Sequence, residues 1–372
     1  LLAAGGDSVA FGNAPLPDYR SAGLDVPLLP ENFPPLTTCI PKLTDFGLAQ
    51  LLDRQHVQPS LGFAAGTPCY MAPEQVLADR PDVRHVRFEP GMDLRALMAE
   101  LAATECGLIV LNSGDGLVHG VLGALFLGRA FDEPPPLALL PRGMTNMTAA
   151  DVGLGARDPG TLARVLDLAA QGAMEQHIVH RQVLKVEYDP ERPGERGMFF
   201  GAAGIYDGIH LCTGSIHTRG LTGSWASTAT ILAALARAVV QGVEATGLGG
   251  DEIGVRVDGG AWSEGRRSLL LATTLDRLVL GTRPFWNNGR EPIHFTVFDH
   301  PPHGIVRHAR RLLFGGRERS LPDPPFRSCG AAKVELRLDR PFTIDGEFFR
   351  AAPGVPIVIT ADEAIRYVKL RR

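Results

Sequence analysis

A glycine-rich turn between an apolar segment and an apolar-striped helix does most to limit how this chain can fold. The apolar segment Cys106–Leu111 runs into Asn112–Gly116, in which two glycines flank Asp115. Apolar residues then recur at helical spacing between Leu117 and Leu127. The pattern predicts a buried strand, a turn and the first turn of a packed helix. Backbone N–H groups and the positive end of a helix dipole meet at such a turn, which is where a phosphate can bind.

Strand and helix patterns alternate around this turn. Val83–Phe88 is expected to form a short strand, and Asp93 can cap the helix that follows it. Leu137–Leu140 has the composition of another buried strand, and a further helix is expected from Asp158 to about Ala173. Alternating strands and helices are typical of a parallel α/β layer.

The pattern after His177 is mainly β. One long helix is expected at about Trp225–Thr246 and a shorter one at Ile305–Phe314. An α/β half followed by an antiparallel half predicts two lobes with a cleft between them, and ligands usually bind in such clefts. Eight strands are expected, at Ile178–Tyr188, Met198–Ala202, Ile253–Val257, Ser268–Thr274, His294–Phe298, Val334–Leu338, Phe342–Ile344 and Val355–Ile359.

Composition argues against several classes of function. The formal net charge of −4 gives no electrostatic reason to expect nucleic-acid binding. Five cysteines without CxxC spacing favour a reducing, cytoplasmic compartment. No run of about 18 apolar residues is present to span a bilayer. These features predict a cytoplasmic protein, with peripheral membrane association and a homodimer left open.

Residues 41–75 resemble part of a eukaryotic-type protein kinase. Pro41–Ala49 (PKLTDFGLA) contains that family's DFG, and Gly66–Gln75 (GTPCYMAPEQ) resembles the end of its activation segment. No glycine-rich loop with a strand lysine precedes them, and Pro27 stands at the place of the catalytic aspartate. Because a protein kinase needs these groups together, residues 1–82 are expected to be a largely irregular kinase-like fragment without that activity.

A second resemblance covers about residues 83–370 and rests on three motifs in order. Asn112–Leu117 (NSGDGL) stands where the family has GGDGT, and Leu140–Asn146 (LPRGMTN) where it has LPxGTxND. Asp345-Gly346-Glu347 matches the family's DGE, and Phe199–Asp207 agrees more weakly with its glycine turn. In these motifs the chain resembles the diacylglycerol kinase catalytic family of lipid kinases, which shares its architecture with NAD kinases.

The resemblance implies an α/β plus β fold of the two-lobe NAD kinase/diacylglycerol kinase type. Residues 83–175 would form a Rossmann-like α/β lobe that binds the nucleotide. This lobe is truncated at its start, because no counterpart of the family's opening strand precedes Val83. Residues 176–372 would form an antiparallel β-sandwich lobe, and residues 1–82 a poorly folded segment before both.

The resemblance also implies the reaction and its site. An ATP- and Mg²⁺-dependent enzyme would transfer the γ-phosphoryl group to a lipid hydroxyl at a membrane surface. Glu347 would take the proton of that hydroxyl, Asp115 would assist it, and Asp115 and Asp345 would bind Mg²⁺. The nucleotide would be bound by two glycine turns, namely by Ser113, Gly114, Asp115, Gly116, Gly143, Thr145 and Asn146.

Several positions depart from the family's motifs and leave other functions open. Ser113 replaces a glycine, and Leu117 and Met144 replace threonines. Met147 replaces an aspartate, and Asn287-Asn288 stand where an acidic turn associated with a structural Mg²⁺ is common. An impaired member that binds only nucleotide or lipid is therefore the main alternative. An NAD kinase-like enzyme is a weaker one, because the DGE motif argues against it.

Simpler interpretations remain for the DGE motif, for a pair of histidines and for a cluster of basic residues. Asp345-Gly346 is a favoured hairpin dipeptide, so the DGE motif also fits an ordinary turn. His177 and His180 would face opposite sides of a strand, so no metal site is expected there. A basic cluster could touch anionic lipid headgroups or simply form a solvated helix face. The cluster consists of Arg307, His308, Arg310, Arg311, Arg317 and Arg319.

Overall fold

The computed structural model describes residues 80, 82–89, 91–141, 145–155, 159–207, 250–286 and 289–370. The chain divides into two compact units, and nearly all described elements belong to the unit made of Leu1–Ala4, Asp82–Arg157 and Ala163–Arg372. Four features singled out in the sequence lie outside the described residues. They are the kinase-like motifs at 41–75, the helix expected at 225–246, Gly143 with Met144, and Asn287-Asn288.

A parallel strand pair with two helices forms the α/β layer. Strand β1 (Ile109–Ser113) pairs with β2 (Leu137–Pro141) in parallel, and α3 (Asp115–Gly128) follows β1 directly. Helix α2 (Leu94–Ala103) packs on α3. The Asp93 carboxylate caps α2 by accepting the N–H groups of Arg95 and Ala96, as the sequence predicts.

The prediction of a strand at Val83–Phe88 is wrong. Residues 83–89 have no regular secondary structure, although Val86 and Phe88 pack against the core. Alternating apolar residues show which side of an extended segment is buried, but a strand also needs a neighbour for its backbone hydrogen bonds. Within the described part of the chain, β1 pairs with β2 alone.

Two helices follow β2, of which the sequence predicted one. Helix α4 (Met147–Val152) is a short element directly after the second glycine turn. Helix α5 (Pro159–Ala170) matches the expected helix and ends three residues early. A 3₁₀ turn (Glu175–His177) then leads into β3 (Ile178–Glu187).

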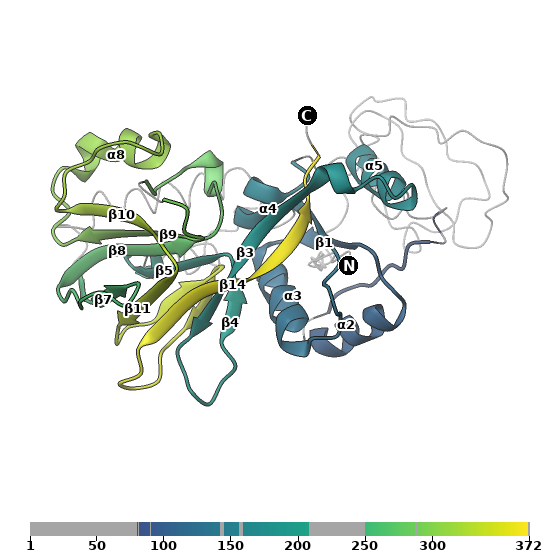
Figure 1. The fold of residues 1–372 in the computed structure, drawn as a ribbon, viewed down its shortest axis with the longest axis horizontal. Coiled ribbons are helices and arrows are strands. Elements are labelled where there is room, and N and C mark those ends of the chain that lie inside the picture. The colour runs from purple at the N-terminus through teal and green to yellow at the C-terminus, as the bar shows by residue number, and fades with distance from the viewer. Residues whose placement is uncertain are drawn as a thin grey trace, which may run out of the picture. The chain divides into compact units, whose positions relative to one another are not determined.

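The long strand β14 (Ile357–Val368) joins the two kinds of sheet structure. It pairs with β3 along most of its length, and it pairs in parallel with β2 where Tyr367 faces Leu137. Its first residues pair with β11 (Lys333–Arg337), which pairs in turn with β7 (Gly254–Val257). Figure 1 shows β3 and β14 running side by side from one lobe to the other.

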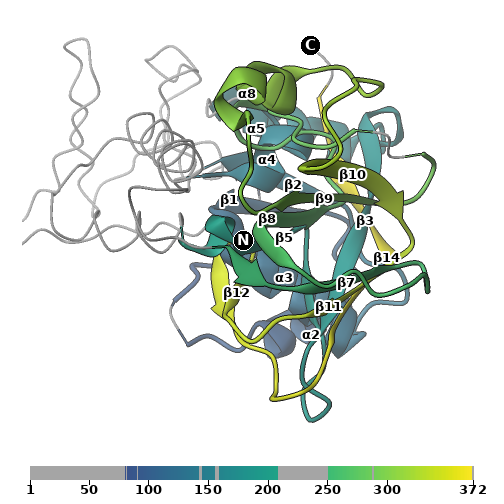
Figure 2. The same cartoon turned by 90° about the vertical axis from the view of Figure 1, so that its left-hand side faces the viewer.

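A second, antiparallel sheet lies against this one and completes a β-sandwich lobe (Figure 2). Apolar residues from both sheets form one core, among them Val186, Phe200 and Ile359. Helix α8 (Ile305–Phe314) has the bounds that the sequence predicted. The strands in pairing order are β10 (Phe326–Ala331), β9 (Ile293–Asp299), β8 (Arg266–Thr273), β5 (Phe199–Ala203), β12 (Phe342–Ile344) and β13 (Glu347–Phe349), with β6 (Asp251–Glu252) beside β8.

The described chain therefore has the expected α/β lobe and the expected antiparallel β-sandwich lobe. Strand β4 (Glu195–Gly197) extends the first sheet from β3 and comes to lie beside α3. None of the helices within the described ranges is long and apolar enough to cross a membrane.

Candidate functional site

The first glycine turn has the predicted local structure. Strand β1 ends at Ser113, Gly114 is extended, and α3 begins at Asp115. The Ser113 hydroxyl donates a hydrogen bond to the carbonyl oxygen of Gly114 over 3.2 Å. Gly116 is exposed in the first turn of the helix. A helix N-terminus at the carboxyl end of a parallel strand is thus open to an anionic ligand.

The second glycine turn meets the first through Asp115. Asn146 lies in the left-handed region at φ 48°, and its side chain does not cap the helix α4 that follows it. The Asp115 carboxylate does so instead. It accepts the N–H group of Met147 over 2.8 Å and that of Thr148 over 3.1 Å. The structure therefore brings Ser113–Gly116 and the Thr145–Asn146 end of the second turn together.

The position of Asp115 alters its acidity. Burial raises the pKa of Asp115, the two N–H hydrogen bonds lower it, and the charge of Asp345 raises it again, to about 6. The carboxyl group is therefore only partly protonated near neutral pH. A pKa of about 6 falls in the range in which a carboxyl group can exchange a proton during a reaction.

The DGE motif forms the turn of the β12–β13 hairpin, as its simpler interpretation predicts. Asp345 and Gly346 have φ values of 50° and 95°, which fits a two-residue hairpin turn. The buried Asp345 carboxylate accepts the N–H groups of Met198 and Phe199 at 2.9–3.1 Å. Asp345 therefore fixes the hairpin to the start of β5.

Glu347, the exposed last residue of the motif, reaches the first glycine turn. A methyl group built on Gly116 would lie 3.1 Å from Glu347 Oε1. The hairpin thus delivers a carboxylate to the N-terminal turn of α3, although 230 residues separate the two in sequence.

His119 is a residue of the site that the sequence analysis missed. It lies on α3 one turn after Asp115 and is nearly buried. Its Nδ1 lies 3.5 Å from Asp345 Oδ2, and its Nε2 lies 3.6 Å from Glu195 Oε2 on β4. These distances are longer than those of good hydrogen bonds, and Nδ1 makes none in the described structure, so the contacts are close ion pairs.

The two carboxylates decide the charge of His119. Burial would lower its pKa, but the interactions with Asp345 and Glu195 outweigh burial and raise the pKa to about 9. His119 is therefore a cation at neutral pH. A polar residue within the apolar stripe of a helix, one turn after the GDG aspartate, is the signal that could have identified it.

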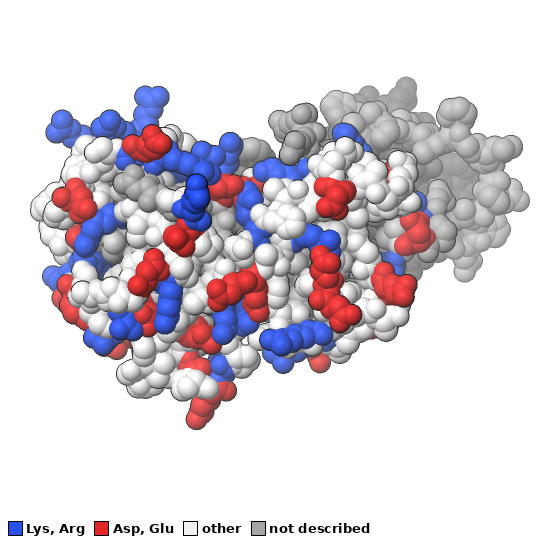
Figure 3. Space-filling model, in the orientation of Figure 1, with Lys and Arg blue, Asp and Glu red and all other residues white. Residues whose placement is uncertain are grey.

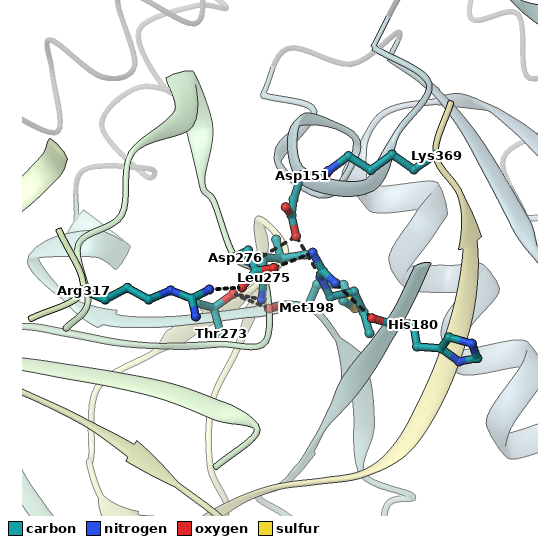
Figure 4. A network of polar contacts seen from close by, with 9 residues as sticks. Asp151, His180, Met198, Thr273, Leu275, Asp276, Arg317 and Lys369 are labelled. Atoms are coloured by element: carbon teal, nitrogen blue, oxygen red, sulfur yellow. Dashed lines mark hydrogen bonds and ion pairs between the residues drawn. The ribbon is translucent and has the colours of Figure 1, made fainter. Parts of the chain in front are cut away.

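A second polar network holds the other end of α4 (Figure 4). Asp151 Oδ2 accepts hydrogen bonds from Arg181 Nε over 2.9 Å and from the Asp276 backbone N–H over 3.0 Å. Arg181 and Arg317 both pair with the Asp276 carboxylate, and Lys369 donates to the Asp151 carbonyl oxygen. Helix α4 is thus fixed by Asp115 at its N-terminus and by this network at its C-terminus.

The carboxylates at the two turns could supply only some of the ligands of a metal ion. Among the described residues, no group of three or more His, Cys, Asp or Glu side chains is arranged to hold a metal ion. The Asp115 and Asp345 oxygens already accept backbone N–H groups. Mg²⁺ is commonly held by one or two carboxylates together with substrate phosphates. These residues fit a metal that arrives with a nucleotide rather than one in an all-protein cage.

Comparisons with known proteins agree with this fold. The diacylglycerol kinase catalytic domain model matches residues 70–180, which include both glycine turns but not the DGE hairpin. A solved diacylglycerol kinase from Bacillus anthracis str. Sterne is 14% identical with a TM-score of 0.51, over 80% of this chain and 88% of that one. A second structure assigned to a diacylglycerol kinase of this organism is 14% identical with a TM-score of 0.54, over 80% and 89%. No curated protein matches the sequence.

Proposed function

We propose that this chain is an ATP- and Mg²⁺-dependent lipid kinase that phosphorylates a diacylglycerol-type hydroxyl at a membrane surface. The observation that carries the proposal is the approach of Glu347 to Gly116. It puts a carboxylate, suited to take a proton, beside a helix N-terminus, suited to bind phosphate. The family model over residues 70–180 and the shared fold support the same reaction.

Positioning of the nucleotide would fall to the two glycine turns. Gly114 and Gly116 leave the backbone at the start of α3 accessible to phosphate oxygens. Thr145 and Asn146 offer hydrogen-bonding groups next to them. Asp115 holds the two turns together, because its carboxylate accepts the N–H groups of Met147 and Thr148. Phosphoryl transfer depends mainly on such positioning and on charge compensation.

Proton removal would fall to Glu347. In the proposed step Glu347 accepts the proton of the lipid hydroxyl while the hydroxyl oxygen forms its bond to the γ-phosphorus. The bond between that phosphorus and the bridging oxygen breaks, and ADP leaves. The His119 cation offsets the charges of Asp345 and Glu195, so fewer uncompensated negative charges face the incoming phosphates.

Asp115 and Asp345 would hold Mg²⁺, which would neutralise phosphate charge during transfer. Both carboxylates already bind backbone N–H groups, so their part in metal binding is a proposal on the chemistry of the donors. The phosphates of ATP would supply the remaining oxygen ligands.

A second candidate is a relative that binds nucleotide without transferring phosphate. The Met147 side chain is buried where the family has an aspartate, so this position offers no carboxylate to the site. Leu117 likewise brings no hydroxyl to the first turn. ATP would then raise the melting temperature of the protein without being consumed.

The test is incubation with ATP labelled at the γ-phosphate, Mg²⁺ and vesicles containing a diacylglycerol, a monoacylglycerol or a sphingoid base. A labelled lipid is the expected product. Thermal stabilisation by ATP with no labelled lipid would support the binding-only candidate instead. Formation of NADP from NAD would overturn both in favour of an NAD kinase-like enzyme.

A further inference from the structure

Helix α8 presents an unusual combination of side chains to solvent. Val306 is 63% exposed and Phe314 59% exposed, and with Arg310 they fall at i, i+4 and i+8 on one face of the helix. Arg307 and Arg311 are exposed directly beside them. We call these five residues the arginine face. The opposite side of the helix is anchored by the buried Ile305 and Leu312.

The positive charge of the arginine face has no partner within the described chain. None of the ion pairs of the described residues includes Arg307, Arg310 or Arg311. Figure 3 shows basic side chains gathered over the part of the molecule where Figure 1 places α8. The helix dipole favours cations in the last turn, but Arg307 lies in the first turn, where the dipole opposes it.

The arginine face is presented by a firmly held helix. Arg319, nearly buried, donates to the carbonyl oxygens of Leu312, Gly315, Gly316 and Arg283 at 2.6–3.1 Å. Its guanidinium also lies 4.9 Å from the centre of the Trp286 ring. These contacts fix the C-terminal end of α8. Binding to this face would therefore not need to order the helix backbone, which lowers the entropic cost of association.

We propose that the arginine face docks on a lipid bilayer that contains anionic lipids. Exposed apolar residues among arginines fit the boundary between headgroups and acyl chains, with the guanidinium groups on the phosphates. Nucleic acid would use the arginines but gives no reason for the exposed Val306 and Phe314. The inference rests on the proposed function, since it names the surface through which a lipid kinase would reach its substrate.

The test is sedimentation of the full chain with vesicles of phosphatidylcholine alone or with added phosphatidylglycerol. The wild type is expected to bind the anionic vesicles. The triple variant Arg307→Gln, Arg310→Gln and Arg311→Gln is expected to bind about 100-fold more weakly, since each arginine near an anionic surface contributes about a fivefold factor. The double variant Val306→Ser and Phe314→Ser is expected to bind more weakly as well.

A matched control changes the same charge on other elements. Arg87→Gln, Arg95→Gln and Arg129→Gln remove three exposed arginines elsewhere in the chain and should leave vesicle binding unchanged. Circular dichroism of each variant checks its folding. Equal binding by the wild type and both α8 variants would overturn the inference. Absence of vesicle binding by the wild type would also overturn it, even if the wild type bound an RNA oligonucleotide.

A short-chain, water-soluble diacylglycerol separates this inference from the proposed function. The triple variant should keep its activity on the soluble lipid and lose it on anionic vesicles. If the soluble lipid is phosphorylated and the triple variant binds vesicles as well as the wild type does, the docking role of the arginine face is overturned and the kinase proposal stands. Vesicle binding that depends on the arginines, with neither lipid phosphorylated, would overturn the kinase proposal alone.

Discussion

Asp115, Asp345 and Glu347 all carry a carboxylate at the candidate site, but their surroundings give them different tasks. Asp345 is buried and fixes the hairpin to the backbone of β5. Asp115 caps α4 and has a pKa raised to about 6. Glu347 is exposed next to Gly116. Of the three side chains only that of Glu347 is exposed, which supports the proposal that Glu347 takes the proton.

Replacement of His119 by Gln tests the cation between two of the site's acidic side chains. The change leaves the carboxylates of Asp345 and Glu195 without their compensating charge, which should lower the unfolding free energy by about 3 kcal/mol. Thermal or urea unfolding measures this, with His85→Gln as the exposed control. An unfolding free energy equal to that of the control variant would contradict the ion pairs described here.

His294, which lies far in sequence from the carboxylates of the two turns, is expected to make stability depend on pH in the acid range. Burial, assisted by the charge of Arg317 and opposed by that of Asp276, lowers its pKa from 6.5 to about 4. Its ring is stacked on Phe285 with centroids 4.4 Å apart.

Because the folded pKa of His294 is depressed, the unfolded chain binds the proton more tightly. Stability is therefore full above about pH 6.5 and decreases by up to about 3 kcal/mol as the pH falls towards 4. Urea unfolding at a series of pH values measures the decrease. His294→Gln should remove this part of the pH dependence; the same slope in the variant would show that another group is responsible.

At the scale of elements, the β12–β13 hairpin is placed by close packing against β4. A methyl group built on Gly197 would lie 2.5 Å from both Asp345 Oδ2 and Ile344 Cγ2. Gly197→Ala must therefore displace the hairpin, at a cost of about 1–3 kcal/mol. It should also reduce phosphoryl transfer, because Glu347 moves with the hairpin.

Gly107→Ala is the control for this change, since nothing lies within 4 Å of a methyl group built there. Thermal unfolding and the lipid kinase assay are run on both variants. If Gly197→Ala matched Gly107→Ala in melting temperature, the close packing of β4 against the hairpin would be wrong.

Elements with strong local patterns could be predicted from the sequence, and those defined by distant partners could not. The apolar stripes gave α3 and α8, and the Asp93 cap gave the start of α2. Strand β14 was predicted only to Ile359, because Asp362 and Glu363 interrupt the alternation at a bulge that only its pairing with β3 explains. The short strands β4 and β13 and the helix α4 have too few residues to show a period.

At the scale of the whole molecule, the site is assembled from contacts between distant segments. The motifs predicted which turns belong to it, but not the hydrogen bonds from Met147 and Thr148 to Asp115. Nor did they predict the ion pairs of His119, whose partners come from β4 and from the hairpin turn. Such contacts depend on how β3 and β14 link the lobes, which no local pattern encodes.

The most direct test of the account compares the wild type with Glu347→Gln in two measurements on each protein. One is the affinity for ATP with Mg²⁺, and the other is the transfer of labelled γ-phosphate to diacylglycerol in anionic vesicles. The account predicts similar ATP affinity for both proteins and a transfer rate at least about 100-fold lower in the variant, the range for loss of a general base. A labelled lipid formed equally fast by Glu347→Gln, or none formed by the wild type, would contradict it.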